Sequence, residues 1–209
     1  MCIRDRVNIN RNSKSCTTIG IIGVSAGVGV SHLSFMMASY LSMIRGYRVA
    51  LIERASDDCF RQAGIIRDSL DRRRYNAFKR NVSIFMQSDI EELSEVMSSD
   101  YEYIIIDFGN DYADNRPFFL LSSIKIVIGN LSWWKLQHYV AFIAATEKEQ
   151  SRKHWKFLGT VSSERTIRYM GKRMRTAIRP VPYEPDPFFL TGETTVSYTH
   201  LTLPTILRV

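Results

Sequence analysis

The sequence is short of the residues that build disulfide frameworks and metal sites. It contains 3 cysteines and 4 histidines among 209 residues, and no set of cysteine, histidine and aspartate has the spacing of metal ligands. So few cysteines exclude a disulfide scaffold and favour the reducing cytosol. No apolar run approaches the roughly 18 residues of a membrane span, and the observed start lacks the pattern of a signal peptide. We therefore expect a cytoplasmic protein without a membrane span.

Both ends of the chain read unlike a folded domain. Residues 1–6 (MCIRDR) back-translate to a transposon end used in sequencing libraries. Residues 196–209 begin with VSYTHLTLPT, which back-translates to the opposite strand of the same end. We interpret both segments as adapter scars and expect a single domain over residues 7–195. The alternative is that both are disordered tails. Under the scar interpretation the natural reading frame can continue past either end.

Basic residues outnumber acidic ones, and the formal net charge is +7. Such a balance attracts phosphates, nucleic acid and acidic lipid surfaces. The basic residues gather at Arg72–Arg74 and over Arg165–Arg179. If these clusters bind nucleic acid, counterion release should make the binding sensitive to salt. The alternative is that they form solvated helix faces.

Short apolar runs rich in β-branched residues alternate with helical stretches along the chain. Several runs are apolar without alternation, as expected for parallel strands buried on both faces. This alternation predicts an α/β fold with a doubly wound, mostly parallel sheet flanked by helices in three layers. The predicted strands are Thr17–Val24, Arg48–Glu53, Val82–Met86, Tyr103–Asp107, Ile124–Gly129, Lys156–Val161 and Thr176–Val181. The predicted helices are Ser31–Arg45, Asp89–Met97, Ser132–Thr146 and Glu164–Arg175.

Two adjacent tryptophans stand near the start of the third predicted helix. Trp133 shares a stripe of helical spacing with Leu136, Val140 and Ile143, so we expect it in the core. Trp134 falls beside that stripe and is the better candidate for a partner interface.

The most informative segment joins the first predicted strand to the first predicted helix. This glycine loop, residues 23–32, reads GVSAGVGVSH. A turn between a strand and a helix presents successive main-chain N–H groups, and the positive end of a helix dipole, to an anion. Gly27 and Gly29 would let the backbone approach a phosphate closely. The segment therefore predicts a phosphate site, with a plain turn that binds no ligand as the alternative.

The glycine loop, the acidic residue that ends the second strand and the YIIIDFG run at residues 103–109 together resemble a known family. The chain is similar to the MinD/ParA group of deviant Walker-A ATPases, which includes the TadZ-like proteins of pilus assembly. The similarity covers nearly all of residues 17–190, including VPYEPDP at residues 181–187. It implies a P-loop NTPase-like fold, ATP or ADP as ligand with Mg²⁺, and a homodimer.

The resemblance also implies which residues form the site. Ser31 and Asp107 match the hydroxyl and the carboxylate that hold the magnesium ion in this family. Gly109 follows Asp107 at the family's spacing. His32 could contact a phosphate from the first helical turn, or simply be a polar residue at a helix start. The implied nucleotide-binding residues are Ala26, Gly27, Val28, Gly29, Val30, Ser31, His32, Gly109 and Pro182.

Residues 25–31 read SAGVGVS where the family signature is KGGVGKT. Val30 replaces the lysine of the phosphate loop, and Ser25 replaces the signature lysine that reaches across the dimer. Ala55 stands where the family has a second aspartate that orients the attacking water. A charge-assisted hydrogen bond is worth roughly 1.5–3 kcal/mol, so Val30 should weaken nucleotide binding about ten- to hundredfold. Because phosphoryl transfer depends on positioned charge and an oriented nucleophile, we expect little hydrolysis and assign no catalytic residue.

The sequence therefore predicts a degenerate MinD/ParA-like protein, a pseudo-ATPase that acts as a positioning or assembly factor for a pilus or secretion apparatus. It would act through an unknown protein partner, which could recruit it to a membrane. One alternative is a competent ATPase in which Arg72–Arg74 supply the missing charge. Others are a nonspecific DNA-binding module resting on residues 164–175, and a scaffold that binds no nucleotide.

Overall fold

A seven-stranded parallel sheet forms the centre of the protein. The computed structural model describes residues 16–55, 59–60, 80–86, 90–181 and 184–202. The strand order is β3-β2-β4-β1-β5-β6-β7, and every recorded strand pair is parallel. The strands are β1 (Thr17–Gly23), β2 (Val49–Glu53), β3 (Val82–Phe85), β4 (Tyr103–Asp107), β5 (Ile124–Asn130), β6 (Lys156–Thr160) and β7 (Ile178–Pro180). This arrangement confirms the predicted doubly wound α/β fold, and each predicted strand is present within about two residues of its expected bounds.

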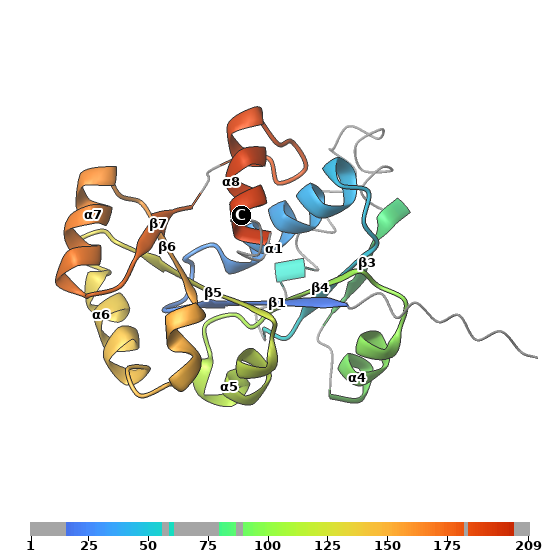
Figure 1. Ribbon diagram of the computed structural model, residues 1–209, viewed down its shortest axis with the longest axis horizontal. Coiled ribbons are helices and arrows are strands. Elements are labelled where there is room, and N and C mark those ends of the chain that lie inside the picture. The colour runs from blue at the N-terminus through green and yellow to red at the C-terminus, as the bar shows by residue number, and fades with distance from the viewer. Residues whose placement is uncertain (1–15, 56–58, 61–79, 87–89, 182–183, 203–209) are drawn as a thin grey trace, which may run out of the picture.

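Helices cover both faces of the sheet, as Figure 1 shows. The helices α1 and α8 lie over one face, and α4, α5 and α6 lie over the other. A π-helical turn, Tyr40–Ile44, extends α1, and a short 3₁₀ helix, Gln150–His154, precedes β6. The helices are α1 (Val30–Ser39), α4 (Ile90–Ser98), α5 (Tyr112–Leu121), α6 (Leu136–Ala145), α7 (Glu164–Arg173) and α8 (Gly192–Thr202).

The central strand is buried on both faces because its apolar side chains alternate between two cores. Ile19 and Ile21 join the core beneath α1 and α8, whereas Ile22 joins the core with α5 and α6. Both cores are therefore continuous with β1, whose carboxyl end leads into the glycine loop. Fully buried parallel strands of this kind explain the runs of apolar residues without alternation.

The helix α5 was not predicted from the sequence. It contains Pro117, and a proline inside a stretch argues against a helix. The helix nevertheless forms, and the Asp111 side chain caps it by accepting a hydrogen bond from Asp114 N at 3.1 Å. Phe119, completely buried, anchors it to the sheet.

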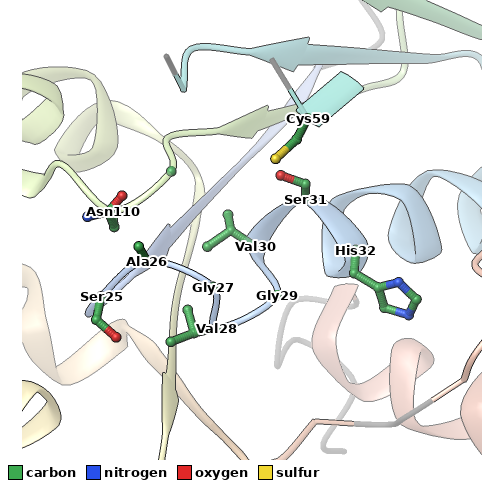
Figure 2. A pocket seen from close by; sticks show the side chains of 11 residues that line it. Ser25, Ala26, Gly27, Val28, Gly29, Val30, Ser31, His32, Cys59 and Asn110 are labelled. Carbon is green, nitrogen blue, oxygen red and sulfur yellow. The ribbon is translucent and has the colours of Figure 1, made fainter. Parts of the chain in front are cut away.

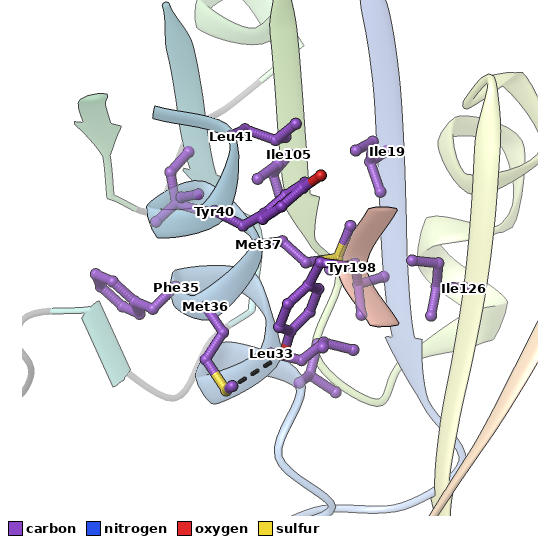
Figure 3. Close-up of a cluster of buried hydrophobic side chains, with 14 of the residues drawn as sticks. Ile19, Leu33, Phe35, Met36, Met37, Tyr40, Leu41, Ile105, Ile126 and Tyr198 are labelled. Atoms are coloured by element: carbon purple, nitrogen blue, oxygen red, sulfur yellow. Dashed lines mark hydrogen bonds between the residues drawn. The ribbon is translucent and has the colours of Figure 1, made fainter. Parts of the chain in front are cut away.

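The helix α8 packs on α1 and includes residues from the segment interpreted as an adapter scar. Figure 3 shows Tyr198 among the apolar side chains of α1. Tyr198 is completely buried, and its hydroxyl donates to Met36 Sδ at 3.4 Å. The hydroxyls of Tyr40 and Thr199 lie 2.7 Å apart. The origin of residues 1–6 and 196–209, and the domain bounds drawn from it, stay predictions, and residues 1–6 lie outside the described residues.

Among the described helices, none combines the length and the apolar character of a membrane span.

Candidate phosphate-binding site

The glycine loop turns sharply between β1 and α1. Gly27 has φ 70° and Gly29 has φ 95°, both in the left-handed region that favours glycine. A Cβ atom on either residue would meet no other atom within 4 Å. The two glycines are therefore required by backbone conformation, and their surroundings are open.

The loop leaves a row of main-chain donors without protein partners. Within the described part of the chain, no acceptor is recorded for the N–H groups of residues 26–31. The first bond of the helical pattern runs from Leu33 N to Gly29 O at 3.0 Å. The first N–H groups of a helix have no intrahelical acceptor, and they carry the positive end of its dipole. The arrangement can accept an anion.

These donors border a pocket of about 270 Å³ at the carboxyl edge of the sheet (Figure 2). No lysine, arginine, aspartate or glutamate lines it among the described residues. The lining residues are Ser25, Ala26, Gly27, Val28, Gly29, Val30, Ser31, His32, Cys59, Gly109 and Asn110. The structure thus brings together all of the residues expected to bind nucleotide except Pro182, which lies outside the described residues.

A second, larger pocket of about 610 Å³ adjoins the first. The two pockets share Gly27, Val28, Gly29 and His32. The second pocket is also lined by the last residue of β7 and by residues that follow it, namely Pro180, Val181 and Pro185. Together the two pockets join the main-chain donors of the glycine loop to an extended, mostly apolar hollow.

Val30 is part of the core. Its exposed fraction is 8%, and Figure 2 shows its side chain within the curve of the loop, near Ala26 and Val28. A Cβ atom on Gly23 would lie 2.8 Å from Val28 Cγ2 and 2.9 Å from Val30 Cγ2, so both valines pack against this glycine. The position at which the sequence resemblance expects a phosphate-binding lysine is therefore used for packing.

Two buried carboxylates end neighbouring strands beside the pocket. Glu53 and Asp107 are in register across β2 and β4, and both are completely buried. Asp107 Oδ1 accepts from Gly109 N at 2.8 Å, and Glu53 Oε1 accepts from Phe60 N at 2.8 Å. Neither side chain lines the pocket, whereas Ser31 does. No cluster of three or more histidine, cysteine or acidic residues with the geometry of a metal site occurs in the described part of the chain.

Known structures share this architecture. A ParA family ATPase from Chlorobium tepidum superposes with a TM-score of 0.61 at 15% identity, covering 88% of this chain and 92% of its own. MinD from Aquifex aeolicus gives a TM-score of 0.55 at 17% identity, covering 88% and 86%. A plasmid partition protein from Borrelia burgdorferi, bound to AMPPNP, gives 0.57 at 17% identity, covering 90% and 96%. The chain has a MinD/ParA-type P-loop fold. At these identities the likeness shows the fold alone, and neither a protein-family model nor a curated protein sequence matches the chain.

Ala55 lies next to the pocket in this P-loop fold. The sequence resemblance predicted that Ala55 replaces an aspartate of the family. Its exposed fraction is 8%. A Cβ atom on Gly109 would lie 2.9 Å from Ala55 Cβ, so the methyl group faces Gly109 at the pocket wall. Gly109 also accepts a main-chain hydrogen bond from Gly23 at 2.7 Å. An apolar methyl group here can orient no water.

His32 is held by the C-terminal part of the chain. Its Nε2 donates to the main-chain oxygen of Glu184 at 2.6 Å. The ring lines both pockets, but this contact directs it to the wall that they share. The structure therefore places the His32 side chain between the glycine loop and the segment that follows β7.

Several site residues were missed by the sequence reasoning. Asn110 follows Gly109 directly, so the resemblance could have suggested it, whereas nothing in the sequence pointed to Cys59. Ser25 was noted only for the lysine it replaces, yet its buried hydroxyl has no hydrogen-bond partner in the described part of the chain. Lys135 lines neither pocket but approaches the loop, and nothing in the sequence pointed to it. Its Nζ donates to Ala26 O at 3.5 Å from the turn that precedes α6.

The prediction that Trp133 lies in the core was wrong. The exposed fractions of Trp133 and Trp134 are 79% and 76%. The predicted helix was begun too early, because residues 132–135 form a turn and α6 starts only at Leu136. The Ser132 main-chain oxygen closes this turn by accepting hydrogen bonds from Lys135 N and Leu136 N. Tyr139, completely buried, is the aromatic anchor of the helix instead.

The basic cluster over Arg165–Arg179 lies on the outer side of α7 and the residues that follow. Ile167 and Met170 are buried on the inner side of that helix. All the cluster's basic side chains are exposed, namely Arg165, Arg168, Lys172, Arg173, Arg175 and Arg179. Arg72–Arg74 lie outside the described residues.

Proposed function

We propose that this protein is a degenerate MinD/ParA-like P-loop protein that binds ATP or ADP as a structural ligand and hydrolyses ATP very slowly. The observation that carries the proposal is the pocket at the glycine loop. Among the residues that the structure describes, it combines a row of main-chain donors with no recorded protein acceptor and walls that contain no charged side chain. Main-chain groups hold a phosphate, whereas charged side chains are what phosphoryl transfer requires.

Binding would rest on three contributions. Main-chain N–H groups from residue 26 onwards and the dipole of α1 favour the phosphates. The Ser31 hydroxyl lines the pocket, and Asp107 ends the adjacent strand β4. Hydroxyl, carboxylate and phosphate oxygens are ligands that Mg²⁺ prefers, so these two residues would hold the ion. Bound magnesium would neutralise part of the phosphate charge.

Slow turnover follows from what replaces the catalytic side chains. Val30 is packed into the core and Ala55 presents a methyl group beside Gly109. Neither can stabilise charge on a transferring phosphoryl group or orient a water molecule. Nucleotide would then stabilise one conformation of the protein for as long as it stays bound.

The biological role we propose is that of a positioning or assembly factor for a pilus or secretion apparatus, working as a homodimer. Support comes from the fold, which is shared with proteins described as acting in plasmid partition and cell division. A MinC:MinD complex from Aquifex aeolicus, whose fold matches with a TM-score of 0.58, is an example in which such a fold engages a protein partner. The exposed Trp133 and Trp134 offer this chain a surface for a partner, which could bring it to a membrane.

Calorimetry with ATP, ADP and AMPPNP in the presence of Mg²⁺ tests the binding half of this proposal. We expect saturable binding and a rise in the unfolding temperature with ligand concentration. Absence of both would support a scaffold that binds no nucleotide. Steady-state phosphate release tests the other half, with Asp107→Ala as the control. Release that continues over many turnovers and disappears in Asp107→Ala would refute the degenerate interpretation.

A second candidate function is nonspecific nucleic-acid binding through α7. The exposed basic side chains on the outer side of this helix favour it. Binding of a duplex by phosphate contacts releases counterions, so affinity should fall steeply between low and physiological salt. An affinity that does not change over this range would exclude the phosphate-driven mode.

A further inference from the structure

The charge missing from the phosphate pocket has a candidate replacement elsewhere in the chain. Lys135 Nζ donates to the main-chain oxygen of Ala26 at 3.5 Å, across a sequence separation of 109 residues. Ala26 itself lines the pocket. The ammonium group therefore lies beside the glycine loop, although Lys135 does not form part of the wall of either pocket in this conformation.

A hydrogen-bonded turn holds the main chain of Lys135 beside the glycine loop. Asn130, the last residue of β5, accepts a hydrogen bond from Ser132 N through its side chain at 2.8 Å. Ser132 O in turn accepts hydrogen bonds from Lys135 N at 3.0 Å and Leu136 N at 2.9 Å. Because β5 pairs directly with β1, this turn starts at the same sheet edge as the glycine loop.

The ammonium group has donors to spare. A lysine carries three N–H donors, and the contact with Ala26 uses one of them at a length near the limit of a hydrogen bond. Among the described residues, the recorded ion pairs are Arg48 with Asp100 and Arg116 with Glu149, so no carboxylate holds Lys135. A four-carbon stem lets the ammonium move by a rotamer change.

We propose that Lys135 is the cation of the nucleotide site and donates to a phosphate oxygen of a bound nucleoside triphosphate or diphosphate. It would supply from the β5–α6 turn the positive charge that the loop lacks at Val30 and Ser25. This inference rests on the proposed function, because it assumes that nucleotide occupies the pocket. It assigns Lys135 a binding role and does not restore the oriented water that Ala55 cannot provide.

A purely structural role makes different predictions. If Lys135 serves only to join the turn to the glycine loop, its removal should affect binding of any ligand in these pockets alike. If it contacts a phosphate, removal should weaken binding of ATP and leave binding of adenosine unchanged. The number of phosphates on the ligand therefore separates the two roles.

The experiment compares Lys135→Met and Lys135→Arg with the unaltered chain in calorimetric titrations with Mg²⁺-ATP and with adenosine. Lys153→Met is the matched control, because Lys153 is exposed and precedes β6 at the opposite edge of the sheet. We expect Lys135→Met to weaken ATP binding about tenfold or more, as the loss of a charge-assisted hydrogen bond does. Lys135→Arg should stay within a few-fold of the unaltered chain, and Lys153→Met should match it.

The outcomes separate this inference from the proposed function. ATP binding that is equal in Lys135→Met and the unaltered chain overturns the role of Lys135 and leaves nucleotide binding intact. Equal weakening of ATP and adenosine also overturns it, in favour of a structural contact. If the unaltered chain binds no ATP, the proposed function fails and this inference fails with it. Thermal unfolding of each variant without ligand shows whether a loss of affinity reflects a loss of folded protein.

Discussion

Replacing Val30 by lysine should strengthen nucleotide binding while it weakens the fold. In the native chain the Val30 side chain is buried and packs with Val28 against Gly23. A lysine at this position can keep its first methylene groups in the core and extend its ammonium group outward. The substitution therefore adds a positive charge to the loop without removing any main-chain donor.

The two effects have opposite signs, and both can be estimated. One charge-assisted hydrogen bond to a phosphate contributes roughly 1.5–3 kcal/mol, which corresponds to about ten- to hundredfold tighter binding. The exposed fraction of Val30 is only 8%, so nearly all of its apolar surface is buried. Losing a branched methyl group from such packing costs about 1 kcal/mol, and the unliganded variant should be less stable by that order.

Calorimetry with Mg²⁺-ATP and chemical denaturation without ligand measure the two effects separately. Val30→Met is the matched control, because methionine has a long unbranched side chain but no charge. We expect both variants to lose stability and only Val30→Lys to gain affinity. Equal affinities for the two variants would refute the reasoning, because they would mean that bound phosphate does not reach this part of the loop.

Three further substitutions test other parts of the structure. Gly29→Ala should lower the free energy of unfolding by roughly 1–2 kcal/mol, because Gly29 has φ 95°. A Cβ atom there would meet no other atom within 4 Å, so the cost should come from the backbone conformation alone. Denaturation by urea measures this cost, and an unchanged stability would contradict the left-handed conformation. Tyr198→Ala should cost about 3–5 kcal/mol, because Tyr198 is completely buried against α1; a loss below about 0.5 kcal/mol would mean that α8 is not docked. Arg116→Met should raise the pKa of Glu149, which the Arg116 hydrogen bond holds below its ordinary 4.5. A depressed carboxyl pKa stabilises the fold above the unfolded value and ceases to do so as pH falls through the folded value, so the difference between the variant and the native chain should shrink below about pH 4.5. Carboxyl NMR titration reports the pKa directly, and an unchanged value would exclude the ion pair.

The strands of the sheet could be predicted from the sequence because each strand is a recognisable apolar run. The strand Tyr103–Asp107 was predicted with the bounds that the structure has. Uninterrupted apolar residues between polar ones leave little choice of where the strand begins and ends. The glycine loop was equally accessible, because its conformation is set by local glycines. All the residues predicted to bind nucleotide, apart from Pro182, line one pocket.

Features that depend on tertiary contacts were not accessible. Trp133 was expected in the core because helical spacing was extended through a turn that Ser132 closes. The approach of Lys135 to Ala26 joins residues 109 positions apart and leaves no mark on either local sequence. The helix α5 forms despite Pro117 because burial of Phe119 outweighs a local preference.

The loop separates two tasks that one motif usually combines. In the proposed function, its hold on an anion would depend on main-chain N–H groups, whose directions are fixed by the left-handed Gly27 and Gly29 and do not depend on the neighbouring side chains. Turnover would depend on side chains, and those at positions 30 and 55 are apolar and buried. Under the proposed function, the apolar residues at the second set of positions would abolish hydrolysis while the first set would still bind phosphate. A pocket whose described walls carry no charged side chain needs a counter-charge from outside its own motif. Magnesium held by Ser31 and Asp107, together with a lysine from the neighbouring turn, would meet that need without rebuilding a catalytic centre.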